Sequence, residues 1–167
     1  RSLEQIVAHA LFADGAAAAT VVRPDGGGLE LVDSGARTDT STAPLMTWDV
    51  TDHGFRMGLS PKVPEAVRRH VAPVVDELLE RQGLTRADVT AWAIHPGGPA
   101  IVDAVGDALG LDDAALEPSR ETLREVGNCS SATVLMVLER LGPVEGNVVG
   151  LAFGPGLTLY GFLLRSA

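Results

Sequence analysis

The sequence predicts an α/β fold in which a mixed sheet is sandwiched between helices. Three observations point to this class: strand-like and helix-like segments are mixed along the chain, the strand-like segments are apolar almost throughout, and 167 residues suffice for one domain with a hydrophobic core. Nearly continuous apolar strands are typical of a sheet covered on both faces, because a half-exposed strand would alternate apolar and polar residues.

The first 60 residues are expected to supply one short helix followed by strands. SLEQIVAH at 2–9 has apolar residues at helical spacing. A run of small and β-branched residues suggests a buried strand that ends at Pro24-Asp25-Gly26, and LELVDSGAR at 29–37 predicts a second strand that pairs back through the glycine-rich turn. Residues 38–47 are polar and loop-like, and 48–60 suggest an irregular strand segment.

A long helix is predicted next. It begins near Pro64, presents valines and leucines on one face and should end at Gly83, while Pro73 inside it can bend it. The same reasoning predicts a short buried strand at 90–94, helices at 98–110, 119–127 (starting at Ser119) and 130–142, and two terminal strands at 147–154 and 157–165.

Composition excludes several classes of function. The net charge is −9 and the chain has a single lysine, so no broad basic surface is expected and nucleic-acid binding is not predicted. No apolar run approaches the length of a membrane span and no signal peptide is visible, so no membrane association is expected. The single cysteine, Cys129, rules out an intrachain disulfide and fits a reducing cytosol, so we expect a cytoplasmic protein.

His95 is the first candidate functional residue. It ends a predicted strand and begins the loop HPGGP, and α/β proteins place ligand-contacting groups at the carboxyl ends of strands. Gly97 and Gly98 would let a ligand approach the backbone closely. The alternative is a histidine that is merely satisfied in the turn before a helix.

Asn128 is the second candidate, just before a strongly apolar helix. Its alternatives are an N-cap or a residue that closes the preceding helix, and Ser130 and Ser131 could equally cap. Cys129 lies next to a helix start, which can lower a thiol pKa, but a small buried filler is the alternative. The loop Gly154-Pro155-Gly156 is either a simple turn or a place where backbone approaches a substrate.

The order and wording of these segments resemble the C-terminal half of type III polyketide synthases, the chalcone synthase-like group. The resemblance is carried by HPGGPAI at 95–101, GNCSSA at 127–132 and AFGPGLT at 152–158, in that order. HALFADGAAAATVV at 9–22 and GFRMGLSPKVP at 54–64 resemble two further segments of the family, so the resemblance covers essentially the whole chain.

The resemblance implies a thiolase-like layered fold of two similar halves, each a sheet between helices, about a shared central helix layer. Residues 1–35 would end the N-terminal half and 36–167 would form the C-terminal half. It further implies a homodimeric acyltransferase that condenses a starter acyl-CoA with malonyl-CoA and cyclises the product to a pyrone or aromatic polyketide, without cofactor or metal. Because the chain opens on Arg1 rather than methionine, we expect a segment of a longer polypeptide, the alternative being an inactive fragment.

The family uses a Cys-His-Asn triad, and His95 and Asn128 match its second and third members. The nucleophilic cysteine would lie upstream of this chain, because Cys129 occupies the variable position after the asparagine. The remaining matches are to substrate-binding positions. They are Met57 (the gatekeeping aromatic, or core filling), Trp48 (a cavity-lining position that is often small), Ser130 (beside the cavity, or a cap), Gly97, Gly98, and the chamber loop Gly154, Pro155 and Gly156.

Two other functions stay open. A ketoacyl synthase III-like condensing enzyme shares the histidine and asparagine, but its histidine is usually followed by Gln-Ala-Asn rather than PGGPA. A non-catalytic thiolase-like subunit that lacks the nucleophile is the second. Arginine strongly outnumbers lysine and alanine and glycine are abundant, as expected from a GC-rich bacterial genome; the sequence does not select a starter unit or product.

Overall fold

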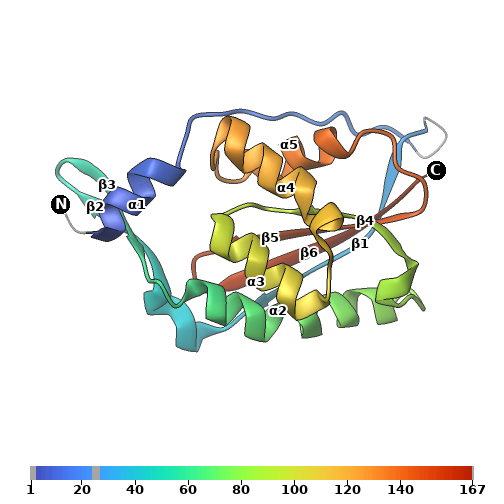
Figure 1. Ribbon diagram of the computed structural model, residues 1–167, viewed down its shortest axis with the longest axis horizontal. Helices are drawn as coiled ribbons and strands as arrows, with labels where there is room; N and C mark the ends of the chain where they lie inside the picture. The colour runs from blue at the N-terminus through green and yellow to red at the C-terminus, as the bar shows by residue number, and fades with distance from the viewer. Residues whose placement is uncertain (1–2, 24–26, 167) are drawn as a thin grey trace.

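The computed structural model describes residues 3–23 and 27–166 of the chain. It contains a four-stranded sheet, a separate two-stranded hairpin and five α-helices in that part of the chain (Figure 1). The elements are α1 Leu3–Leu11, β1 Leu29–Thr38, the 3-10 helix η2 Thr40–Leu45, β2 Met46–Thr51, β3 Gly54–Leu59, α2 Val63–Glu80, the 3-10 helix η3 Arg86–Asp88, β4 Val89–Ile94, α3 Pro99–Leu109, α4 Asp113–Val126, α5 Ala132–Leu141, β5 Asn147–Gly154 and β6 Thr158–Ser166.

The main sheet is mixed and carries helices on both faces, as the sequence predicts. Its strand order is β1-β6-β5-β4, with β4 and β5 parallel and the other pairs antiparallel. Trp92 and Ile94 of β4 pack in the same cluster as α2 and α3, whereas Ala93 packs with α5. Since successive residues of a strand point to opposite faces, α2 and α3 cover one face and α5 covers the other.

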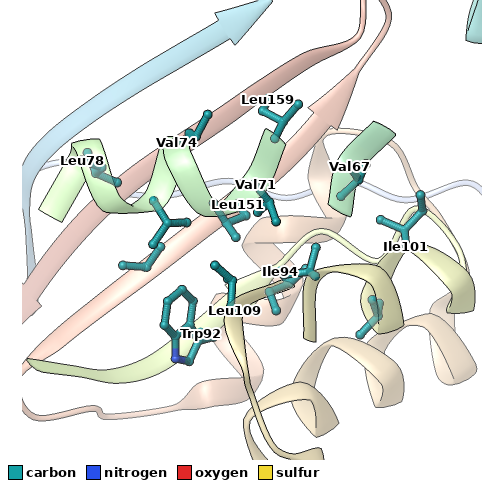
Figure 2. Packing of buried hydrophobic residues seen from close by; sticks show 14 of the residues in the cluster. Val67, Val71, Val74, Leu78, Trp92, Ile94, Ile101, Leu109, Leu151 and Leu159 are labelled. Carbon is teal, nitrogen blue, oxygen red and sulfur yellow. The ribbon is translucent and has the colours of Figure 1, made fainter. Parts of the chain in front are cut away.

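The larger core lies between α2 and the sheet (Figure 2). Val67, Val71, Val74 and Leu78 recur at helical spacing along α2, so they form one apolar stripe that rests on the sheet. Figure 2 shows this stripe facing side chains of β4, β5 and β6, namely Ile94, Leu151 and Leu159, with Ile101 and Leu109 of α3 completing the cluster. Each fully buried aliphatic side chain contributes about 1.5–3 kcal/mol.

Most predicted elements are confirmed: the first helix, the long helix, the helices before Gly110 and Gly142, the strand before His95, and both terminal strands. Gly110 ends α3 in the left-handed conformation at φ +70°, which glycine adopts without strain. The predicted boundary between residues 35 and 36 falls inside β1. Within residues 3–23 and 27–166, no helix is long and apolar enough to cross a membrane.

The buried strand predicted before Pro24 is wrong. Residues 13–23 are exposed and form no strand, and Val21 is 92% accessible; the expected end at Pro24-Asp25-Gly26 lies outside the described residues. The strand at 29–37 does form, but β1 pairs with β6 at the far end of the chain rather than with this segment. An alanine- and valine-rich run favours an extended backbone, but it becomes part of a sheet only where it pairs with a neighbouring strand, and residues 13–23 pair with no strand of the described chain.

Three further predictions need correction. The polar loop at 38–47 contains η2, because the Asp39 carboxylate accepts a hydrogen bond from the Ser41 N–H at 2.9 Å and caps it. The irregular segment at 48–60 is a regular hairpin of β2 and β3. The helix predicted to start at Ser119 starts at Asp113, because Asp112 caps it through the Ala115 N–H at 2.9 Å and the helix accommodates Pro118.

Candidate active site

A cavity of about 940 Å³ opens where the carboxyl end of β4 meets the hairpin, α1 and the loop between β5 and β6. Nine of the ten predicted site residues line it: His95, Gly97, Gly98, Asn128, Met57, Trp48, Ser130, Gly154 and Pro155. Gly156 is next in the chain but is not part of the lining. The fold therefore brings segments from the whole length of the chain to one chamber.

His95 lies at the end of β4 with its main chain fixed and its side chain buried. Its N–H donates to the Leu151 carbonyl at 2.8 Å, which continues the parallel pairing of β4 and β5. The residue is only 7% exposed, and burial lowers the pKa of its imidazole from 6.5 to about 4. At neutral pH the ring is uncharged, so one ring nitrogen donates a hydrogen bond and the other accepts one.

The Asn128 backbone is held on both sides by the end of α1 and the residues that follow it. Its N–H donates to the Leu11 carbonyl at 2.8 Å, and its carbonyl accepts from the Ala13 N–H at 3.0 Å. The side chain is oriented as well: Oδ1 accepts from the Ser130 N–H at 2.9 Å, and Nδ2 donates to the Gly97 carbonyl at 3.3 Å. One Nδ2 hydrogen remains for a ligand in the cavity.

The sequence left open whether Asn128 is the N-cap of the following helix, and the structure shows that it is not. The residue before α5 in the cap position is Ser131, which makes no side-chain capping bond. Asn128 instead closes a short turn through its own side chain, as asparagine commonly does, and its amide nitrogen faces the loop that follows His95.

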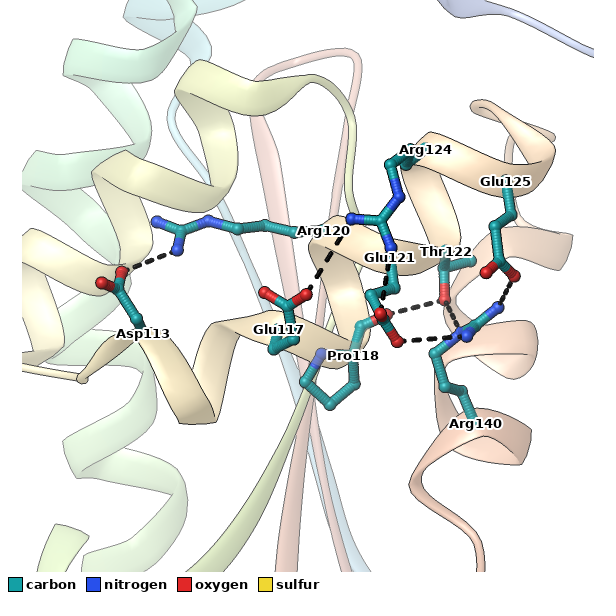
Figure 3. A network of polar contacts seen from close by, with 9 residues as sticks. All are labelled: Asp113, Glu117, Pro118, Arg120, Glu121, Thr122, Arg124, Glu125 and Arg140. Atoms are coloured by element: carbon teal, nitrogen blue, oxygen red, sulfur yellow. Dashed lines mark hydrogen bonds and ion pairs between the residues drawn. The ribbon is translucent and has the colours of Figure 1, made fainter.

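A network of ion pairs holds together the two helices that flank the Asn128 loop (Figure 3). Arg140 of α5 reaches α4, where it contacts Thr122 Oγ1 at 3.2 Å, Glu121 at 3.3 Å and Glu125. Arg120 bonds Asp113 at 2.7 Å and also reaches α3. A single exposed pair contributes little, but Arg140 joins three partners on one helix and so fixes α5 against α4.

Hydrophobic side chains of the β2–β3 hairpin form one wall of the cavity. Met57 is buried and lines the cavity, and its carbonyl accepts a hydrogen bond from the Gln5 amide of α1. Trp48 lines the same wall and makes edge-to-face contacts with Phe12 at 6.2 Å and Phe55 at 6.1 Å between ring centroids. The sequence does not identify Phe12 as a cavity-lining residue. Phe12 lies at the cavity because its backbone pairs with that of Asn128.

The loop at Gly154-Pro155-Gly156 is supported from behind by η2. The Leu157 N–H donates to Thr42 Oγ1 at 2.8 Å, and the Leu157 carbonyl accepts from the Asp39 N–H at 2.9 Å. Asp39 also pairs with His70 of α2 at 2.8 Å. The sequence signal for the supporting role of η2 is Asp39-Thr40-Ser41-Thr42, in which an aspartate precedes a short turn that it can cap. The polar composition of the segment alone predicts only a loop.

The electrostatics of the cavity suit a developing negative charge. Among the described residues, the lining includes no carboxylate, lysine or arginine. The first residues of α3 and the residues just before α5 both lie at the cavity, and neither helix has an acidic residue in its first turn. Helix N-termini carry a partial positive charge, so both macrodipoles favour an anion beside His95 and Asn128.

Comparison with known proteins gives a consistent picture. The family model described as chalcone and stilbene synthases, C-terminal domain, matches residues 38–167. The chain is 41% identical over 174 residues to a 1,3,6,8-tetrahydroxynaphthalene synthase of Streptomyces peucetius subsp. caesius, covering 98% of this chain and 46% of that protein. It is 34% identical over 167 residues to a 3,5-dihydroxyphenylacetyl-CoA synthase of Amycolatopsis orientalis, covering 95% of this chain and 45% of that protein.

Solved structures agree with the sequence relatives. PKS-I from the brown alga Ectocarpus siliculosus superposes with a TM-score of 0.86 at 28% identity, over 99% of this chain and 48% of that one. The 1,3,6,8-tetrahydroxynaphthalene synthase of Streptomyces coelicolor A3(2), a bacterial type III polyketide synthase, gives a TM-score of 0.78 at 34% identity, over 84% and 42%. The chain thus spans a little under half the length of these relatives.

Proposed function

Because this chain belongs to the chalcone and stilbene synthase family of type III polyketide synthases, we propose that it supplies the C-terminal part of an active site that condenses malonyl-CoA with a starter acyl-CoA. The observation that carries the proposal is the convergence of His95 and Asn128 on one cavity without charged lining. The enzyme would be an acyltransferase that works as a homodimer, as the family resemblance implies, and would need no cofactor.

The chemistry follows from the two side chains. The thioester carbonyl of malonyl-CoA accepts hydrogen bonds from the neutral His95 ring and from Asn128 Nδ2. The bond to the carboxylate carbon then breaks, carbon dioxide leaves, and the electron pair forms an enolate whose oxygen these donors stabilise. One such donor is typically worth about 3 kcal/mol in the transition state, and an apolar cavity favours the conversion of a carboxylate to a neutral gas.

The nucleophile that holds the starter lies outside this sequence in our proposal. Cys129 is buried, its Sγ contacts the Val126 carbonyl at 3.4 Å, and it does not line the cavity although both its neighbours do. The enolate attacks the starter thioester on the true nucleophile, a carbon–carbon bond forms, and the cysteine thiolate leaves.

The product is proposed to be an aromatic polyketide. The proposal draws on the names of the relatives, two of which make a tetrahydroxynaphthalene and a dihydroxyphenylacetyl-CoA. Trp48 narrows the chamber on the side of the hairpin and would limit how far the chain is extended.

The test is malonyl-CoA decarboxylation and product formation by the full-length protein, followed by mass spectrometry with a panel of starter acyl-CoAs. His95→Ala and Asn128→Ala should each lower the decarboxylation rate by about 100-fold or more, while Cys129→Ser should retain most of it. Loss of turnover in Cys129→Ser alone would overturn the assignment of roles. A single condensation onto a carrier protein would instead support a ketoacyl synthase III-like enzyme.

A further inference from the structure

The loop that carries Asn128 is closed by a side chain that does not line the cavity. Thr133, in the first turn of α5, is fully buried. Its Oγ1 accepts a hydrogen bond from the Cys129 N–H at 2.9 Å and donates one to the Ser130 carbonyl at 2.8 Å. We infer that Thr133 is a positioning residue for Asn128, an inference that rests on the proposed function of Asn128.

Ser130 links the two residues. Its backbone has φ +59°, in the left-handed region that residues with a side chain rarely adopt. Such a conformation persists only where surrounding contacts over-determine it. The bond from Thr133 to the Ser130 carbonyl, together with the bond from the Cys129 N–H to Thr133, provides those contacts on either side of the strained residue.

The turn that Thr133 holds also orients the asparagine. The Ser130 N–H donates to Asn128 Oδ1 at 2.9 Å, and the direction of that N–H is set by the backbone of Cys129, whose own N–H is bonded to Thr133 Oγ1. With Oδ1 held there, Nδ2 has to point the other way, toward the Gly97 carbonyl and the cavity. Thr133 therefore sets the orientation of the carboxamide through two hydrogen bonds in series.

Only a hydroxyl can do this at position 133. The side chain must accept from one backbone group and donate to another in the same turn, and valine, of nearly the same shape, can do neither. The cap position offers no substitute, because Ser131 makes no side-chain capping bond. In Thr133→Val the packing of α5 is kept, but the Cys129 N–H loses its acceptor and the Ser130 carbonyl keeps only the bond from the backbone N–H of residue 133, at 3.1 Å in wild type.

A control for a merely structural effect lies one turn further along α5. Val137 is also fully buried and packs in the cluster with Ala93 and Val134, and none of the hydrogen bonds of the Asn128 loop given above involves it. Val137→Ala should therefore lower the melting temperature without changing the orientation of Asn128.

The experiment compares malonyl-CoA decarboxylation by the full-length protein and three variants. Thr133→Val should lower kcat by about 10- to 100-fold with KM for malonyl-CoA within about twofold of wild type. Thr133→Ser, which keeps the hydroxyl, should restore kcat, and Val137→Ala should keep it even with a comparable loss of melting temperature. Equal loss of kcat in Thr133→Val and Val137→Ala, or none in Thr133→Val, overturns the inference.

A crystal structure of Thr133→Val tests the same inference without activity. Ser130 should leave the left-handed region and its N–H should no longer bond Asn128 Oδ1; an unchanged loop would overturn the positioning role. A wild-type protein that does not decarboxylate malonyl-CoA refutes the proposed function, whereas an active wild type with an unaffected Thr133→Val refutes only the inference. If Thr133→Val does not fold, Thr133→Ala replaces it because it lacks the same hydroxyl, and an unchanged Ser130 backbone together with an unchanged kcat in that variant would overturn the inference.

Discussion

Burial of His95 predicts how the free energy of unfolding changes with pH. The imidazole has a pKa of about 4 in the folded chain against 6.5 for an unperturbed histidine, and desolvation is the cause. Between these two values the unfolded chain binds the proton that the folded chain excludes. The contribution of the neutral ring is therefore fully present above pH 6.5 and is lost as the pH falls toward 4.

The size of the effect follows from the same two values. Integrated over the window, His95 should cost the folded state about 2 kcal/mol by pH 5 and about 3 kcal/mol by pH 4. His95→Gln provides the comparison, because glutamine is polar and uncharged at every pH. The other histidines, His9, His53 and His70, are present in both proteins, so their contributions cancel in the difference.

The assay is urea unfolding of wild type and His95→Gln at a series of pH values from 8 to 4. Both proteins carry alanine in place of the proposed nucleophilic cysteine, because a thiolate beside the imidazole would raise its pKa. The free energy of unfolding should fall more steeply in wild type, and histidine NMR signals should show one ring, absent from His95→Gln, that titrates near pH 4. Parallel stability curves, or a His95 ring that titrates near pH 6.5, would refute the account of a dry, uncharged cavity.

Two further predictions concern packing and chain length. A Cβ at Gly150 would overlap the ring of Phe162 on the neighbouring strand, so Gly150→Ala should lower the free energy of unfolding by about 1–3 kcal/mol. Adding Phe162→Leu should recover part of the lost melting temperature. An unchanged melting temperature in Gly150→Ala would contradict this packing. Trp48→Ala should enlarge the chamber and shift the products, analysed by mass spectrometry, toward longer chains. Phe55→Ala should not change the products, because Phe55 touches Trp48 but does not line the cavity. Identical product profiles for the two variants would contradict a role of Trp48 in the site.

Elements whose signals are local could be predicted from the sequence, and elements that depend on distant partners could not. The stripe of α2 and the glycine that ends α3 are properties of a few adjacent turns, so both are predicted correctly. The pairing of β1 with β6 joins residues 29–38 to residues 158–166, and nothing in either strand's sequence identifies its partner. For the same reason residues 13–23 have the composition of a strand without being one.

The candidate site divides along the same line. His95 and Asn128 were identified because their flanking residues and order resemble a family, while each alone has an ordinary structural explanation. The geometry that orients Asn128 cannot be predicted from the sequence. It depends on the left-handed backbone of Ser130 and on a threonine in the first turn of α5, and threonine is common at such positions without any special role. The backbone pairing of residues 11–13 with Asn128 is equally invisible, since it joins segments more than a hundred residues apart.

The low pKa of His95 also decides when this residue would carry charge in the proposed enzyme. Its burial disfavours the imidazolium by about 3 kcal/mol, while a thiolate about 4 Å away would favour it by about 4 kcal/mol at an effective dielectric constant of about 20. The two effects nearly cancel, so a free thiolate facing the ring would return its pKa to near the ordinary value and leave it partly charged at neutral pH. Once the cysteine is acylated the negative charge is gone, and His95 returns to the neutral form. In the enzyme that we propose, the histidine would therefore act as a hydrogen-bond donor rather than a cation at the decarboxylation step, and it would be the second donor beside Asn128 to one oxygen.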